Sequence, residues 1–223
     1  MGIVNIGNNC FMNSVFQCLS NIFPLTQYLI TNEYKNEINL YNSLSSKGNI
    51  IIAFTELLKI IWNTKIPESK IDGKLCYYYD QTDKSNSKIM DVFTNLKNEI
   101  GKNNMIYKDY QQHDAIEFFT YFLDIIHEDL KRINSKNIVP IDNLKEKNVE
   151  ILFNNRWDIF KNNNNSIITD IFYGMNHTSI LCSNCLKTYH IFEPFNIIFL
   201  PLNESFNKAN KEEVEAAKKK TIY

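Results

Sequence analysis

The sequence has no long apolar run, no excess of charge of either sign and no recognisable secretory leader. None of its apolar runs reaches the ~20 residues that span a bilayer, so no membrane-spanning helix is expected. The formal net charge is −1, which gives no reason to expect binding to nucleic acid or to an anionic membrane surface. The N-terminus lacks the charged segment and apolar stretch of a signal peptide.

Cysteine is also scarce, and its number is odd. An odd number of cysteines without a signal peptide indicates a reducing compartment, and favours catalytic or metal-binding roles over disulfides. We therefore expect a cytoplasmic or nuclear protein. Hydrophobic residues make up 44% of the chain and aromatic residues 13%, which is typical of a globular protein with a substantial core. The cysteines are Cys10, Cys18, Cys76, Cys182 and Cys185.

Residues 1–135 are patterned as a helical lobe. The stretch 51–62 is apolar nearly all round and predicts a buried helix. A second, amphipathic helix runs to Ile100, where Gly101 is expected to stop it. A third begins near Asp114, whose spacing from Glu117 is that of a capping box, and continues to Ile133. Residues 43–48 and 80–87 are turn-rich and are expected to be exposed loops.

The pattern changes after Pro140. Four short stretches rich in β-branched and aromatic residues predict antiparallel strands. Residues 136–203 should therefore form a strand-rich segment, and residues 204–223 a charged tail or linker. The fold class is α+β. The predicted strands are 167–173, 177–181, 188–192 and 196–200.

Cys10 lies where a glycine-containing loop meets a helix. Apolar residues at Phe11, Val15 and Leu19 have the spacing of one helix face, so the helix begins at about Cys10. Unpaired backbone N–H groups and the positive end of the helix dipole favour a thiolate at such a position. The alternative is that Cys10 is a small buried hydrophobe at the end of a helix.

Three blocks of the sequence, in order, resemble those of the ubiquitin-specific proteases. Residues 2–19 are similar to the cysteine box, residues 110–130 to the glutamine-aspartate box with its helix, and residues 166–202 to the finger and palm segment. The resemblance implies a papain-like cysteine peptidase with thumb, palm and fingers, which cleaves after the C-terminal glycine of ubiquitin. On this resemblance we expect the chain to correspond to the N-terminal part of such a catalytic domain, incomplete at the C-terminus.

The resemblance also implies roles for particular residues. Cys10 is the nucleophile, and Asn5 points its side-chain amide at the oxyanion; the alternative for Asn5 is a turn residue. Gln112 and Asp114 line the channel that holds the basic, extended tail of ubiquitin, where a carboxylate can hydrogen-bond to an arginine. Asp114 can also be simply a helix cap, and both roles are compatible. Catalysis of this kind needs no cofactor.

The general base is missing from the sequence. The family supplies a histidine from a late Gly-His-Tyr-type block, and none of the four histidines here lies in one. The resemblance implies ubiquitin or ubiquitinated proteins as partners. Because the base is missing, we expect little turnover by residues 1–223 alone. The alternative function is a catalytically inactive module that binds ubiquitin or acts as a scaffold. The histidines are His113, His127, His177 and His190.

Cys182 and Cys185 have the spacing of half a tetrahedral zinc site. The family's finger zinc uses a second such pair further along, and no cysteine follows Cys185. A structural zinc ion is therefore predicted only if the other ligand pair comes from elsewhere. The alternative is two packed thiols in a strand turn.

Overall fold

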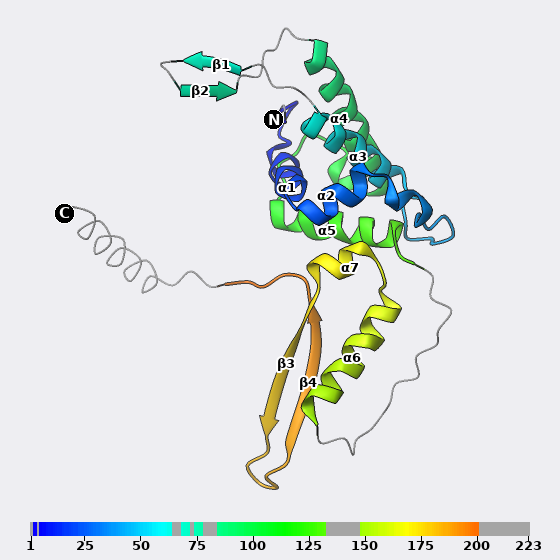
Figure 1. The fold of residues 1–223 in the computed structure, drawn as a ribbon, viewed down its shortest axis with the longest axis vertical. Coiled ribbons are helices and arrows are strands. Elements are labelled where there is room, and N and C mark those ends of the chain that lie inside the picture. Colours follow the sequence, from blue (N-terminus) through cyan, green and yellow to red (C-terminus); the bar gives the residue numbers. More distant parts are fainter. Residues whose placement is uncertain are drawn as a thin grey trace, which may run out of the picture.

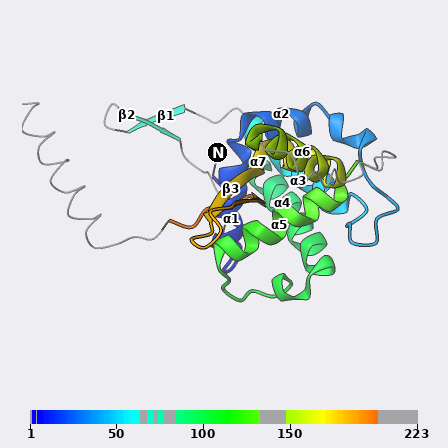
Figure 2. The same cartoon turned by 90° about the horizontal axis from the view of Figure 1, so that it is seen from below.

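The computed structural model describes residues 2–3, 5–63, 68–71, 74–77, 84–132 and 148–200. A helical lobe comes first, and a long two-stranded hairpin with one flanking helix projects from it (Figure 1). Figure 2 looks along that hairpin toward the lobe. The lobe contains α1 (Cys10–Ser20), α2 (Phe23–Ile30), η1 (Glu33–Asn36), α3 (Asn49–Asn63), α4 (Lys84–Asn103), η2 (Met105–Tyr107) and α5 (Ala115–Asp129). Between α3 and α4 in the chain, β1 (Glu68–Ile71) and β2 (Lys74–Tyr77) pair with each other. The projecting part contains α6 (Val149–Asn163), α7 (Ile167–Phe172), β3 (Gly174–Leu181) and β4 (Thr188–Phe195).

A cluster of phenylalanine rings forms the centre of the lobe. Phe16 of α1 has its ring centroid 5.4 Å from that of Phe54 on α3 and 5.0 Å from that of Phe122 on α5. Phe93 of α4 lies 6.1 Å from Phe16. All four side chains are at most 2% exposed, and mixed edge and tilted contacts are those that aromatic rings prefer. Four helices are thereby fixed around one core.

The predicted helices of the lobe are confirmed, but two of their predicted limits are wrong. Helix α4 continues past Gly101 to Asn103, so this glycine does not end the helix. Its role is instead in packing. A Cβ atom there would lie 2.9 Å from Cα of Lys108, so the missing side chain lets the next segment come close. At its other end α4 already starts at Lys84, inside the stretch expected to be a loop. The pairing of β1 with β2 was not predicted.

Helix α5 begins where the capping pattern places it. Oδ1 of Asp114 accepts hydrogen bonds from the backbone N–H groups of Ile116 (2.7 Å) and Glu117 (3.0 Å). The reciprocal bond from Glu117 that completes a capping box is not among the bonds of the described residues. The buried stripe ends at Leu130, and Ile133 lies outside the described residues.

The predicted strand at residues 167–173 is wrong, because this segment is α7. Oγ of Ser166 accepts a hydrogen bond from the N–H of Thr169 (3.2 Å) and caps the helix. Ile168 and Thr169 are fully buried. Capping and burial here outweigh the β propensity of the branched side chains. Helix α6 was likewise not predicted. None of its residues is buried, and its sequence lacks the strong apolar stripe by which a helix is recognised.

Strands β3 and β4 pair antiparallel from Gly174 opposite Phe195 to Leu181 opposite Thr188. This confirms the strands predicted at 177–181 and 188–192. The strand predicted at 196–200 is wrong: those residues follow β4 without pairing, and Ile198, Phe199 and Leu200 are exposed.

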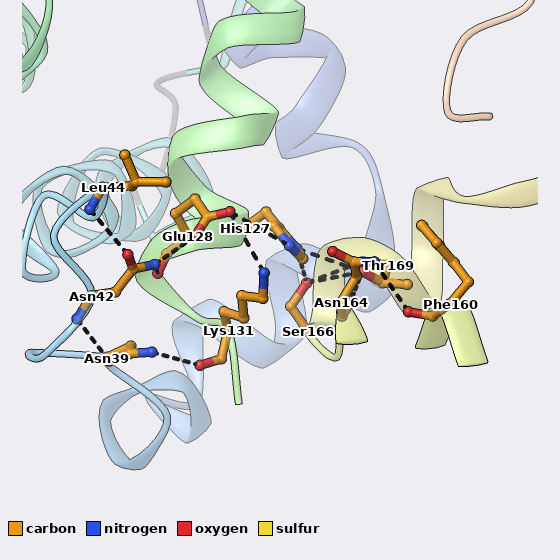
Figure 3. A network of polar contacts seen from close by, with 10 residues as sticks. All are labelled: Asn39, Asn42, Leu44, His127, Glu128, Lys131, Phe160, Asn164, Ser166 and Thr169. Atoms are coloured by element: carbon orange, nitrogen blue, oxygen red, sulfur yellow. Dashed lines mark hydrogen bonds and ion pairs between the residues drawn. The ribbon is translucent and has the colours of Figure 1, made fainter. Parts of the chain in front are cut away.

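The C-terminal end of α5 joins the lobe to the projecting part (Figure 3). On one side, Nδ2 of Asn39 donates to the carbonyl of Lys131 (3.1 Å), and Asn42 bonds to Glu128. On the other, Nδ1 of His127 lies 2.7 Å from Oγ of Ser166 at the start of α7. The position of α7 against the lobe is therefore fixed by buried polar contacts as well as by packing.

No helix among the described residues is long and apolar enough to cross a membrane. The predicted segment limits near residues 135 and 203, and the whole of the segment 204–223, lie outside the described residues.

Candidate active site

Two asparagine side chains shape the loop before α1. Oδ1 of Asn5 accepts hydrogen bonds from the backbone N–H groups of Gly7 (3.1 Å) and Asn9 (3.4 Å). Asn9 is fully buried, and its Oδ1 accepts a hydrogen bond from the N–H of Ile6 (2.8 Å). Gly7 (φ +122°) and Asn8 (φ +46°) both have positive φ, which glycine and asparagine tolerate. The loop is therefore held by its own amides.

Cys10 is the first residue of α1 and is exposed to solvent. Asn9 occupies the capping position but makes no side-chain cap to α1, because its carbonyl oxygen is turned into the loop. The first N–H groups of α1 are thus not capped by that side chain. Cys18, on the same helix, is also exposed. The expectation that Cys10 begins a helix is confirmed, and its alternative as a buried hydrophobe is wrong.

The cysteine loop contacts the glutamine-aspartate segment directly. Nδ2 of Asn8 donates a hydrogen bond to the backbone carbonyl of Tyr110 (3.0 Å). The ring of Tyr110 covers Gly7, where a Cβ atom would lie 3.0 Å from Cδ1 of the tyrosine. Two blocks that are distant in sequence therefore lie against each other. Cys10 comes two residues after Asn8 in the chain, and Asp114 comes four residues after Tyr110.

Lys97 of α4 binds the backbone of the segment that leads into Tyr110. Its Nζ donates to the carbonyls of Lys108 and Asp109, both at 2.8 Å, and lies 4.3 Å from the ring centroid of Tyr110. Lys97 is only 6% exposed, and burial lowers the pKa of its ammonium group, while Asp109 raises it. The sequence analysis missed this residue. The signal was a lysine on the apolar face of a helix, four residues after Phe93.

Gln112 and Asp114 are both exposed beside the junction. Oδ1 of Asp114 is used by the helix cap, whereas Oδ2 makes no bond to any described residue. Gln112 makes no polar contact within the described part of the chain. Both side chains can therefore offer polar atoms to a ligand without breaking the fold.

No histidine hydrogen-bonds to Cys10 within the described residues. The ring of His113 contacts those of Phe11 (5.2 Å) and Tyr107 (5.1 Å); its buried Nε2 has no hydrogen-bond partner among the described residues and is 3.9 Å from Oδ1 of Asp109. His127 is buried against Ser166, and His177 and His190 lie on the projecting hairpin. The absence of the general base from these four histidines stays a prediction.

Cys182 and Cys185 lie within the tight turn that connects β3 to β4. The N–H of Cys182 donates to the carbonyl of Lys187 (2.9 Å), and the N–H of Leu186 donates to the carbonyl of Cys182 (2.9 Å). Backbone N–H groups of Cys185 and Asn184 lower the pKa of the Cys182 thiol, as suits a metal ligand. Among the described residues no three His, Cys, Asp or Glu side chains converge on one point.

Comparison with known proteins identifies relatives for most of the chain. A family model for "ubiquitin carboxyl-terminal hydrolase" matches residues 1–220. Ubiquitin carboxyl-terminal hydrolase 15 of Bos taurus is 33% identical over 201 residues, and ubiquitin carboxyl-terminal hydrolase 4 of Mus musculus is 32% identical over 201 residues. Each alignment covers 90% of this chain but only 19% of the relative, so the chain spans about a fifth of those proteins.

Solved structures show the same fold. A SAGA DUB module containing Ubp8, bound to monoubiquitin, matches with a TM-score of 0.54 at 19% identity, over 87% of this chain and 34% of that chain. A second such module, bound to ubiquitin aldehyde, matches with a TM-score of 0.51 at 18% identity, over 87% and 33%. The predicted α+β class of papain-like thumb, palm and fingers is confirmed.

Proposed function

Since this chain belongs to the ubiquitin carboxyl-terminal hydrolase family, we propose that it supplies the nucleophile and part of the ubiquitin-tail site of a thiol-dependent deubiquitinase. The observation that carries this proposal is the junction of Asn8 with Tyr110. It brings an exposed cysteine, at a helix start to which the Asn9 side chain makes no cap, next to a segment with exposed polar groups. A nucleophile and a binding channel are useful together only in that arrangement.

In the proposed reaction, a general base takes the thiol proton of Cys10, and its Sγ attacks the carbonyl carbon of the C-terminal glycine of ubiquitin. A C–S bond forms, and the carbonyl oxygen becomes an oxyanion. Nδ2 of Asn5 is the side-chain donor for that oxyanion; its Oδ1 is already held by the loop, which orients the amide. Collapse breaks the C–N bond, the amine leaves with a proton from a general acid, and water then hydrolyses the thioester.

The general acid and base is a histidine from outside residues 1–223. Positioned acid–base catalysis typically contributes about 10² to 10⁴-fold, so the chain without that histidine should retain little turnover. Gln112 and Oδ2 of Asp114 bind the extended basic tail of ubiquitin, with Asp114 facing an arginine. No cofactor takes part in this chemistry.

A structural zinc ion is compatible with the tip of the hairpin. Cys182 and Cys185 lie in a tight turn whose N–H groups favour the thiolate, and they would supply two of the four ligands. The other two would come from residues outside the described part. We assign ubiquitin and its conjugates as partners, and the free cysteines agree with a reducing compartment such as cytoplasm or nucleus.

The rival proposal is an inactive module that binds ubiquitin or acts as a scaffold. It uses the same surface but does not require a reactive Cys10. Limiting alkylation with iodoacetamide separates the two, because Cys18 is an exposed cysteine on the same helix and serves as an internal control. An activated Cys10 is labelled faster than Cys18; equal or slower labelling contradicts the nucleophile assignment.

Turnover tests the proposal directly. We define the complemented enzyme as residues 1–223 joined to, or mixed with, a segment that carries the family's histidine block. It should cleave a ubiquitin C-terminal amide, Cys10→Ala should abolish that cleavage, and Cys18→Ala should leave it intact. Full turnover by residues 1–223 alone would show that the base lies within them, and His113 would be the first to replace.

A further inference from the structure

A pair of histidines bridges the projecting hairpin, well away from the cysteine turn. Nε2 of His177 on β3 lies 2.8 Å from Nδ1 of His190 on β4. His177 is paired with Phe192 in the strand register and His190 with Ser179, so the two histidines are diagonal neighbours on one face. Each is five residues from the nearer cysteine of the turn. The pair is thus a separate cluster.

One ring of the pair is held in place. The ring of His177 stacks on Phe192 with centroids 4.9 Å apart and planes 18° from parallel. Phe192 in turn makes an edge contact with Phe153 of α6, at 6.0 Å. This packing fixes the direction in which Nε2 of His177 points, which is a form of preorganisation for a ligand.

We propose that His177 and His190 bind a divalent transition metal ion, such as Zn²⁺, as a clip across the hairpin. Zinc–nitrogen bonds of ~2.0–2.1 Å at a tetrahedral angle put two ligand nitrogens about 3.3 Å apart. The observed separation of 2.8 Å needs to open by only about 0.5 Å. The bridging proton shifts to the other nitrogen of its own ring, so both facing nitrogens present lone pairs to the metal.

The chemistry of the donors limits which ion is bound. Imidazole nitrogens suit Zn²⁺, Cu²⁺ and Ni²⁺, whereas Mg²⁺ and Ca²⁺ prefer oxygen ligands. Glu193, the one carboxylate within β3 and β4, is paired with Asn176 and so projects from the opposite face. Water completes the coordination, and Ser179, opposite His190 in the register, has a hydroxyl on the same face of the hairpin. The site is therefore open.

The hairpin needs such a clip. A two-stranded hairpin alone is marginally stable in water, and along β3 every residue from Asn176 to Leu181 is exposed. An ion that binds only the paired strands stabilises them by mass action. Bound metal should therefore protect the amides of β3 and β4 from exchange.

Metal titration of residues 1–223 tests the site. The Cys182→Ser/Cys185→Ser double variant, with Cys10 and Cys18 also replaced by serine, serves as background, so that neither the turn nor the exposed thiols of α1 can bind the ion. ZnCl₂ titrated into it in a calorimeter should bind in a 1:1 ratio. CoCl₂ should give visible d–d absorption without a thiolate charge-transfer band. His177→Gln and His190→Gln should each weaken zinc binding by roughly tenfold or more, since even an outer-shell change costs that much.

Controls keep the result interpretable. Thr178→Gln, on the other face of β3, should leave the affinity unchanged, and circular dichroism should show each variant folded. Hydrogen exchange in β3 and β4 should slow on addition of ZnCl₂ in the background variant but not in His177→Gln. No binding to the background variant, or binding that survives both histidine changes, would overturn the proposal and leave the pair as a hydrogen bond only.

Discussion

Asn8 donates a side-chain hydrogen bond to the backbone carbonyl of Tyr110, 102 residues further along the chain, at 3.0 Å. The bond exists because Asn8 accepts a positive φ and because Gly7 leaves room for the tyrosine ring. The position of Cys10 relative to the proposed ubiquitin-tail segment therefore depends on Gly7, Asn8 and Tyr110, none of which we assign to the nucleophile or to the tail site.

Gly7→Ala should disturb this junction. The new Cβ would lie 3.0 Å from Tyr110 at a backbone conformation that side chains rarely adopt, at a cost of about 1–3 kcal/mol. Because small displacements at an active site can reduce rates by about 10²-fold, kcat/KM of the complemented enzyme should fall by about 10- to 100-fold. Gly2→Ala is the matched control, since a Cβ there meets nothing within 4 Å. Equal activity of the two variants would contradict the role of the junction.

Lys97→Met should destabilise the lobe. The methionine fills most of the space, but the carbonyls of Lys108 and Asp109 lose their buried donor. The free energy of unfolding in urea should fall by about 1.5–3 kcal/mol. Lys102→Met, on the same helix but with a side chain 71% exposed in its pair with Glu99, should stay within about 0.5 kcal/mol of the parent. A neutral Lys97→Met would mean that the carbonyls find water instead.

Asp114→Asn separates the two roles of this residue. Asparagine caps a helix about as well as aspartate, so the thermal midpoint should hardly change. The charge that we propose for the ubiquitin-tail site is lost, so the affinity of the complemented enzyme for ubiquitin should fall by about 1.5–3 kcal/mol in calorimetry. Asp114→Ala should lose both affinity and stability. Unchanged affinity in Asp114→Asn would remove the carboxylate from the binding site.

The stability of the chain should decrease in mild acid because of His127. Burial lowers the pKa of His127 below its ordinary value of 6.5, with a smaller opposing effect of Glu128 and a lowering effect of Lys131. As the pH falls from 6.5 toward the lowered pKa, the unfolded chain binds more protons than the folded chain, so the free energy of unfolding falls. Above pH 6.5 the stability contribution is fully present.

Replacing the ring should remove that dependence. His127→Gln, whose amide can still bond to Ser166, should lose less stability between about pH 7.5 and pH 5.5 than the parent, while Thr178→Gln, at an exposed position without a titratable group, should behave like the parent. Burial also raises the pKa of Asp129, which acts in the opposite direction from about pH 3.8 upward but is common to all three proteins. Parallel pH profiles for parent and His127→Gln would contradict the assignment.

Local patterns predicted much of the lobe because its helices follow local rules. The apolar spacing after Cys10 and the cap at Asp114 depend only on neighbouring residues, and both are confirmed. The segment 167–173 failed because its branched residues favour a strand, whereas burial of Ile168 and the Ser166 cap favour a helix. The prediction that Gly101 ends a helix was wrong, because glycine is required there by the close approach of Lys108 and not by a helix end.

The candidate site divides in the same way. Cys10 and Asp114 were found from motifs, while Lys97 and the Asn8–Tyr110 bond were not, because they depend on contacts between distant segments. Such contacts appear only when the tertiary structure is known. The histidine pair also escaped notice, because the strand register alone brings its members together.

Arg132, just past the C-terminal end of α5, reaches both parts of the molecule. Its Nε donates to Oε2 of Glu37 in the lobe (2.9 Å), and its Nη1 donates to Asn165 (2.9 Å) and Asp170 (3.3 Å) at α7. Strand β3 starts immediately after α7 and runs for 8 residues, or about 26 Å at ~3.3 Å per residue. If the hairpin tilted by about 10° at α7, its far end would therefore move by roughly 5 Å over the length of β3. Small adjustments among the few polar contacts of Arg132 would therefore become much larger displacements of the cysteine turn at the far end of the hairpin.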